Sequence, residues 1–103
     1  MNVRFEAQAV EQVRAVHAWW KENRTSAPTL FADELRGAVR RLRDDALAER
    51  PYPSRTVYDV RRILLPRSRY HAYYVIDETL DAVVVLALWG AVRGRVPRLF
   101  RAR

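Results

Sequence analysis

The side chains best suited to chemistry in this sequence are basic. Eighteen of the 19 basic residues are arginine, and Lys21 is the single lysine. Arginine holds phosphates and carboxylates through a planar fork of donors, but its pKa above about 12 prevents it from acting as a base. Chemistry that needs a lysine base can therefore use only Lys21. The helical pattern places this residue on the exposed side near the end of the first helix.

Four arginines form the strongest candidate site. Arg61 and Arg62 lie in the first of three consecutive predicted strands, and Arg93 and Arg95 follow the last one, just beyond Trp89. If those strand ends are neighbours, the guanidinium groups converge and can hold phosphates in bidentate fashion. A solvated sheet edge, or a docking site for carboxylates of a partner protein, explains the same pattern equally well.

His71 and Glu49 are the other candidates for acid–base chemistry. Imidazole titrates near pH 6.5, so a histidine can exchange protons close to working pH. His71 lies in the middle of a predicted strand between large aromatic residues, where a histidine is more often packed than catalytic. Glu49 lies in the loop region that precedes the strands.

Composition excludes several classes of protein. The chain has 103 residues and no cysteine, which excludes disulfides, iron–sulfur clusters and thiolate zinc sites, and two histidines make a poor metal cage. We expect no metal and no cofactor. The longest apolar run, residues 82–92 at most, is shorter than the roughly 20 residues of a membrane span. The N-terminus lacks a signal-peptide layout, so a cytoplasmic protein is expected.

The positive charge is concentrated in the second half of the chain. The formal net charge is +7 and the isoelectric point is near 10.7. Residues 1–53 carry nine basic and eight acidic groups, a net of +1, whereas residues 54–103 carry ten and four, a net of +6. Such an excess favours an anionic partner such as nucleic acid or an acidic protein.

Hydrophobic periodicity predicts one small α+β domain over residues 1–103. Apolar residues recur at helical spacing in two segments and then alternate with period two. Two helices joined by about five residues form a hairpin, which must pack on one face of an antiparallel sheet in two layers. The predicted order is a strand at 2–5, a helical hairpin within about 7–48 whose second helix starts near Ser26–Pro28, a loop at 50–54, strands at 57–65, 70–76 and 82–89, and a basic tail at 90–103.

Four segments in this order resemble the RelE/ParE toxins of bacterial type II toxin–antitoxin systems. They are WWKEN (19–23), FADEL (31–35), VRRILLPRSRYHAYYVID (60–77) and VVVLALWGAVRGR (83–95). The resemblance covers nearly the whole chain. It implies a two-layer fold of order β-α-α-β-β-β and a growth-inhibiting toxin, held in a hetero-oligomer by an acidic antitoxin that wraps it. The target is then either DNA gyrase or the ribosome with its mRNA.

The two branches of this family differ in chemistry. RelE-like members cut mRNA in the ribosomal A site without metal, and by resemblance Arg61 and Arg93 best match the arginines that serve the phosphate, with His71 as a candidate base. Phe100, the best match to the terminal tyrosine of that branch, can stack but cannot donate a proton. ParE-like members poison gyrase without an acid–base pair. The missing lysine base and tyrosine favour the ParE branch. An mRNA endoribonuclease and a non-toxic member that only binds its antitoxin remain the alternatives.

Some residues are better candidates for contact with the antitoxin than with the target. Trp20 lies on the apolar stripe of the first helix and is expected in the core, whereas Trp19 lies on its shoulder. An exposed tryptophan is a typical interface anchor. Arg67 and Arg69, in the turn between two predicted strands, and Phe100 in the basic tail complete the predicted antitoxin-binding set.

Overall fold

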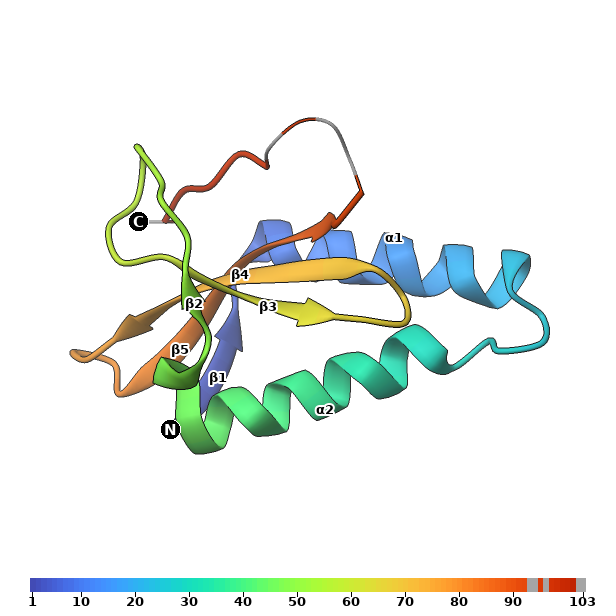
Figure 1. The fold of residues 1–103 in the computed structure, drawn as a ribbon, viewed down its shortest axis with the longest axis horizontal. Helices are drawn as coiled ribbons and strands as arrows, with labels where there is room; N and C mark the ends of the chain where they lie inside the picture. Colours follow the sequence, from blue (N-terminus) through green and yellow to red (C-terminus); the bar gives the residue numbers. More distant parts are fainter. Residues whose placement is uncertain (93–94, 96, 102–103) are drawn as a thin grey trace.

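Two helices cover one face of a five-stranded sheet, and the C-terminal segment passes over the other face (Figure 1). The computed structural model describes residues 1–92, 95 and 97–101. In chain order the elements are β1 (Asn2–Phe5), α1 (Ala7–Asn23), α2 (Leu30–Asp45), the 3-10 helix η1 (Ala46–Ala48), β2 (Arg50–Pro51), β3 (Arg61–Leu65), β4 (Tyr70–Asp77) and β5 (Ala82–Gly90).

The sheet is mixed, with strand order β1-β5-β4-β3-β2. β3, β4 and β5 form the predicted antiparallel meander. The prediction of a wholly antiparallel sheet is wrong at one edge, because β1 runs parallel to β5, with Asn2 opposite Ala82 and Phe5 opposite Val85. The α+β class is confirmed. A four-residue apolar-polar pattern sets the face of a strand but carries no information on its direction.

Three predicted boundaries moved for local reasons. The strand expected at 57–65 begins at Arg61, because the preceding turn places Asp59 in the left-handed region with φ 56°. The predicted loop at 50–54 contains β2, which pairs with β3. α2 begins at Leu30 rather than near Ser26–Pro28, since residues 24–29 form turns in which the N–H of Ala27 bonds to the carbonyl of Arg24 at 3.0 Å.

Buried side chains form a separate cluster on each face of the sheet. The helix-side cluster contains Trp20 and Phe31, which confirms the prediction that Trp20 belongs to the core. Because side chains alternate along a strand, the opposite face carries its own cluster, which Leu99 of the C-terminal segment joins. β5 is buried on both faces, as its continuous apolar run predicts. A bulge opposite Tyr73 and Tyr74 places Leu86 and Ala87 together on the side away from the helices.

A carboxylate on α2 holds the turn between β3 and β4. Glu34 accepts the N–H of Arg67 at 2.9 Å and that of Ser68 at 2.7 Å. Burial alone would raise the pKa of Glu34, but the bonds from Arg67 and Ser68 and the charge of Arg67 outweigh it, so its pKa is lowered. A helix and a turn 33 residues apart in sequence are thereby joined.

We expect Glu34→Gln to destabilise the protein by about 1–2 kcal/mol, the difference that charge makes to hydrogen bonds of this kind. Because the folded-state pKa lies below the unfolded one, the contribution is present above the unfolded pKa and is lost as pH falls through the folded pKa. Urea unfolding at pH 7 and at pH 3 measures this, with the exposed Glu22→Gln as the matched control. Equal losses of stability at the two pH values would contradict this role.

Candidate functional site

Cationic and aromatic side chains gather on the helix-free face, by which we mean the sheet face opposite α1 and α2. Strand alternation places Arg62 of β3 on this face, together with His71 and Tyr73 of β4. The register sets Arg62 opposite Tyr73 and His71 opposite Trp89 of β5. These residues therefore form a row across three neighbouring strands.

Arg62 lies at one end of the row, over an aromatic ring from the β2–β3 loop. Its guanidinium carbon is 5.1 Å from the ring centroid of Tyr52. Tyr52 in turn meets Tyr73 edge to face, with centroids 4.9 Å apart. Tyr73 is buried, whereas Arg62 and Tyr52 are partly exposed. Packing on Tyr52 thus fixes the direction of the Arg62 guanidinium, which still reaches solvent. A phosphate site requires both properties.

A second cation–aromatic pair lies at the other end of the row. The indole N–H of Trp89 donates to the carbonyl of Arg95 at 3.0 Å, and the guanidinium carbon of Arg95 is 5.9 Å from the Trp89 ring centroid. The structure therefore places Arg62, Trp89 and Arg95 on one face of the sheet. Arg93 lies outside the described residues.

His71 lies between these two pairs. Its ring centroid is 6.0 Å from that of Tyr73, and the side chain is partly buried. Burial, followed by the positive charge of Arg62, lowers the pKa of His71 below its usual 6.5. The imidazole is accordingly neutral at pH 7 and able to accept a proton.

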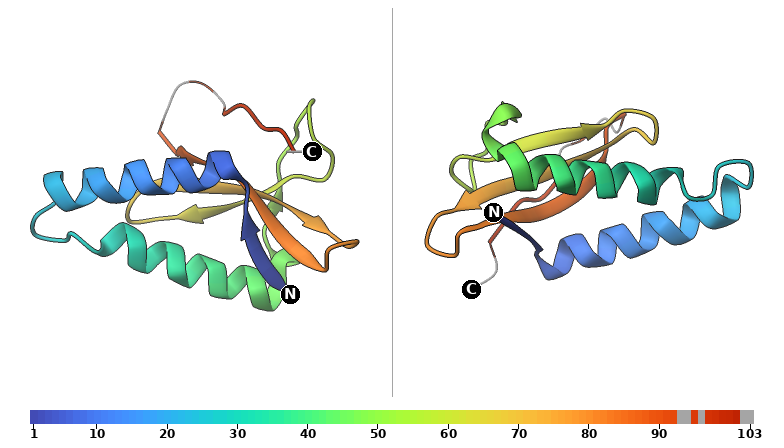
Figure 2. Two further views of the ribbon diagram at one scale, coloured as in Figure 1. Left: turned by 180° about the vertical axis from the view of Figure 1, so that it is seen from behind. Right: turned by 90° about the horizontal axis from the view of Figure 1, so that it is seen from below.

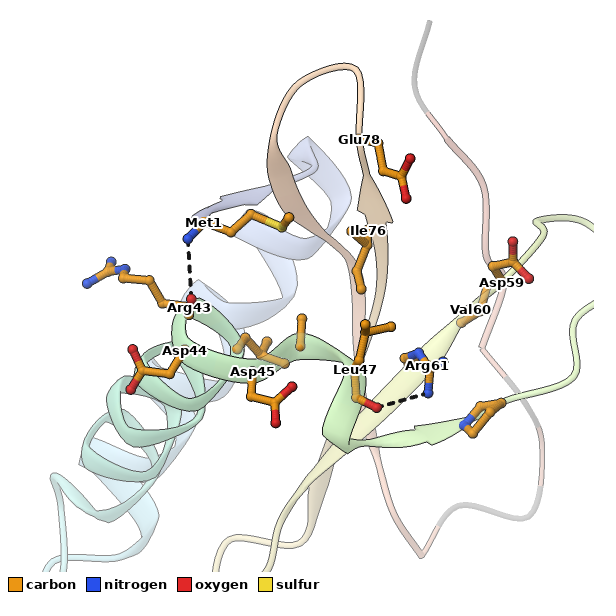
Figure 3. A pocket seen from close by; sticks show the side chains of 13 residues that line it. Met1, Arg43, Asp44, Asp45, Leu47, Asp59, Val60, Arg61, Ile76 and Glu78 are labelled. Carbon is orange, nitrogen blue, oxygen red and sulfur yellow. Dashed lines mark hydrogen bonds between the residues drawn. The ribbon is translucent and has the colours of Figure 1, made fainter.

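Arg61 does not join this face, because successive residues of a strand point to opposite sides. Figure 3 shows Arg61 directed toward Leu47 of η1. It donates to the carbonyl of Glu49 at 2.6 Å and to that of Leu47 at 3.4 Å. It lines a cavity of about 600 Å³ together with four acidic residues, Asp44, Asp45, Asp59 and Glu78. The predicted convergence of Arg61 with Arg62 is therefore wrong.

The other two candidates for proton transfer lie away from the row. Lys21 is exposed in the last turn of α1, on the helical side. Glu49 is paired with Arg41, at 3.0 Å between Oε2 and Nη2. Neither is placed to serve a substrate held by Arg62 and Arg95.

The predicted antitoxin-binding residues are divided between two ends of the molecule. Trp19 is 43% exposed at the end of α1, with the Arg24 guanidinium 5.0 Å from its centroid. Arg67 and Arg69 lie in the β3–β4 turn, which is at the same end as the α1–α2 loop (Figures 1 and 2). Phe100, 47% exposed, lies in the C-terminal segment at the opposite end.

Sequence reasoning missed the groove between the two helices, which we call the hairpin groove. It has a volume of about 620 Å³ and lies between α1 and α2, reaching Phe5 of β1. Val10, Val13, Leu35 and Val39 supply its apolar surface. Its rim is basic, with four arginines at positions 14, 36, 40 and 43. The periodic pattern showed the apolar and basic stripes of each helix, but only the packing of the two helices leaves part of the apolar stripes uncovered.

Sequence reasoning also missed Tyr52, which it assigned only to a proline-rich loop. An aromatic residue between two prolines was the available signal. Its contacts with Arg62 and Tyr73 depend on how that loop folds back over the sheet.

Comparison of the sequence with models of known protein families and with curated proteins found no match. Among the helices of the described residues, none combines the length and apolar character that a bilayer crossing requires. Within the same residues, no three metal-binding side chains of histidine, cysteine, aspartate or glutamate gather closely enough to hold an ion.

Proposed function

We propose that this protein is a RelE/ParE-like toxin that arrests growth by poisoning DNA gyrase and is neutralised by an acidic antitoxin. The observation that carries the proposal is the helix-free face, where Arg62 on Tyr52 and Arg95 on Trp89 flank a shared row. Such pairs suit phosphates and unstacked bases. A poison that traps a protein–DNA intermediate needs this kind of surface but no acid–base pair.

The arrangement of elements supports the same proposal. The helical hairpin on one face of the sheet, followed by three antiparallel strands, agrees with the order that the RelE/ParE resemblance implies. The positions of Lys21 and Glu49, away from the basic row, also favour a poison over an enzyme that depends on them.

Purified gyrase and relaxed plasmid test the proposal. Adding the protein should lower supercoiling and leave linear DNA after detergent and protease treatment, because the cleaved intermediate is trapped. Unchanged supercoiling together with cut mRNA on programmed ribosomes would overturn it. Continued growth on induction without antitoxin would instead support a protein that only binds its partner.

The hairpin groove supports the antitoxin part of the proposal. Its apolar surface and four-arginine rim complement a helix with one apolar and one acidic face. An acidic antitoxin would satisfy both features at once. Trp19, Arg67, Arg69 and Phe100 remain predicted contacts for other parts of the same partner.

We expect Arg36→Glu/Arg40→Glu to weaken binding of the proposed acidic antitoxin by at least about tenfold, since reversed rim charges oppose an acidic helix. Calorimetry on the purified pair measures the affinity. Arg4→Glu/Arg50→Glu, two exposed arginines on β1 and β2 that do not line the hairpin groove, makes the same change of charge and is the control. Equal losses in the two double variants would show that net charge, not the hairpin groove, determines binding.

One observation favours a second function, ribosome-dependent mRNA cleavage. His71 lies beside Arg62 on the helix-free face and has a lowered pKa from burial and from that arginine. A neutral imidazole near a phosphate-binding cation can take a proton from the attacking hydroxyl.

In that case His71→Asn would abolish A-site cleavage. The wild-type rate would rise with pH through the lowered pKa of His71 and level off by neutral pH, since the base acts when deprotonated. Single-turnover cleavage on programmed ribosomes measures both effects. Under the gyrase proposal, His71→Asn retains most of its poisoning activity, so the two assays on one variant separate the functions.

A further inference from the structure

A cleft of about 800 Å³ borders the helix-free face, between the β2–β3 loop and residues 97–101, which we call the C-terminal strap. We call it the loop–strap cleft. Tyr52 and Arg55 line it from the loop, and Arg98 and Phe100 line it from the strap. Figure 1 shows the strap beside this loop, above the sheet.

The strap is anchored by partly buried ion pairs. Arg101 reaches Glu6 through Nε at 3.2 Å and Asp77 through Nη2 at 3.1 Å, and the two carboxylates are only 11% and 17% exposed. Limited exposure to water strengthens the Coulomb attraction between such charges, and loss of one partner would leave the others uncompensated. The side chain of Leu99, 5% exposed, adds an apolar anchor in the cluster under the strap.

Hydrogen bonds also tie both walls of the cleft in place. The hydroxyl of Thr56 donates to the carbonyl of Leu99 at 2.7 Å, which links the loop to the strap. The side-chain amide of Gln8 on α1 donates to the carbonyl of Arg98 at 3.1 Å. The cleft is therefore formed before any ligand arrives, which lowers the entropy cost of binding.

The charge of this cleft favours an anion. Its described lining includes Arg55 and Arg98 and no acidic residue. Both arginines are exposed, and neither takes part in an ion pair among the described residues. The cavity around Arg61, in contrast, sets four acidic residues against two arginines. The charges therefore favour binding of an anionic ligand in the loop–strap cleft over binding in the cavity around Arg61.

The aromatic residues of the cleft indicate the chemical class of the anion. Phe100 is 47% exposed on one wall, and Tyr52 is partly exposed on the other. Ser54 and Thr56 add hydroxyl groups to the same lining. Two cations, two aromatic faces and hydroxyl groups match a phosphate, a base and a sugar.

We propose that the loop–strap cleft binds a nucleotide unit of single-stranded nucleic acid, with its phosphates on Arg55 and Arg98 and its base between the aromatic walls. The proposal rests on the proposed function in one respect, since it takes the target to carry nucleic acid. Its test does not use gyrase or ribosomes, so the two can fail separately.

Fluorescence anisotropy with labelled 12-nucleotide oligothymidine and oligouridine tests the proposal on the full chain. We expect Arg55→Ala/Arg98→Ala to weaken binding by about tenfold or more and to reduce the salt slope by about 1.4, since a single strand releases roughly 0.7 counterions per contact. Phe100→Leu should weaken binding about fivefold or more through lost stacking. Arg40→Ala/Arg43→Ala, an equal loss of charge on α2, should change binding by less than about twofold.

Comparing the two oligonucleotides identifies whether the bound strand is DNA or RNA, and tight binding of either one supports the proposal. Equal weakening by the two double-arginine variants, or displacement by inorganic polyphosphate with no effect of Phe100→Leu, would overturn it, because binding would then depend on charge alone. Absence of binding at low salt would also overturn it. Circular dichroism confirms folding, which the exposed positions of Arg55 and Arg98 should preserve.

Discussion

Arg62→Glu is expected to abolish growth arrest and to raise the protein concentration needed for half-maximal gyrase cleavage by at least about tenfold, the change in affinity typical of losing a charge-assisted contact. The substitution removes the guanidinium from over the Tyr52 ring and places a negative charge in the row of the helix-free face. Plasmid cleavage at increasing protein concentration measures the effect. Arg62→Lys keeps the charge but loses the planar fork, so an intermediate activity is expected.

The pKa of His71 reports independently on the electrostatic effect of Arg62→Glu. Burial and the charge of Arg62 both lower the pKa of His71. With glutamate at position 62 only the burial effect remains, and the new charge favours the imidazolium, so the pKa of His71 should rise. NMR titration of the histidine ring measures this. A raised pKa with unchanged poisoning would exclude Arg62 from the target surface, and affinity for the antitoxin should stay unchanged.

Tyr74→Ala is expected to cost about 3–5 kcal/mol of stability, the range for removing a large buried aromatic side chain. Tyr74 has no exposed surface and lies in the helix-side cluster. Its hydroxyl donates to the carbonyl of Ala46 at 2.5 Å, which links β4 to η1. Tyr74→Phe keeps the ring and should cost about 1–2 kcal/mol, because a buried carbonyl loses its partner. Urea unfolding of the three proteins separates packing from hydrogen bonding.

Alkaline pH provides an independent check on the Tyr74 hydroxyl. Burial and then the negative charge of Glu49 raise the pKa of Tyr74 to about 12, above its usual value of 10. Between pH 10 and pH 12 the unfolded chain releases this proton while the folded chain retains it, so this part of the stability is present below pH 10 and declines above it. Tyr74→Phe lacks this decline. Parallel pH profiles for the wild type and Tyr74→Phe would contradict the assignment.

Elements with a long, regular pattern were predicted well, and those fixed by distant contacts were not. Period-two alternation located β4, and a continuous apolar run located β5, within one residue at each end. Alternation was also used for β3, but it extended this strand too early, because Val57 and Val60 are packed against the sheet without belonging to a strand. Periodicity reports burial and not backbone pairing. The parallel alignment of β1 depends on where the helical hairpin returns the chain, which no local pattern contains.

The candidate site was predicted in part for the same reason. Arg62, Trp89 and Arg95 lie on one face because side chains alternate along neighbouring strands, although Arg62 is near the start of β3 and Trp89 is near the end of β5. Arg61 is one residue away in sequence but points to the other side, where backbone carbonyls hold it. The hairpin groove and the loop–strap cleft are each built from two segments far apart in sequence, so their shapes appear only in the folded chain.

The most direct measurement of the central claim is the amount of linear plasmid that gyrase releases after detergent and protease treatment, with and without the proposed acidic antitoxin. We expect linear DNA to accumulate with the wild-type protein, to fall to background when the antitoxin is in excess, and to be strongly reduced with Arg62→Glu at the same protein concentration. Background levels of linear DNA with the wild-type protein, under conditions in which it cuts mRNA on programmed ribosomes, would contradict the account.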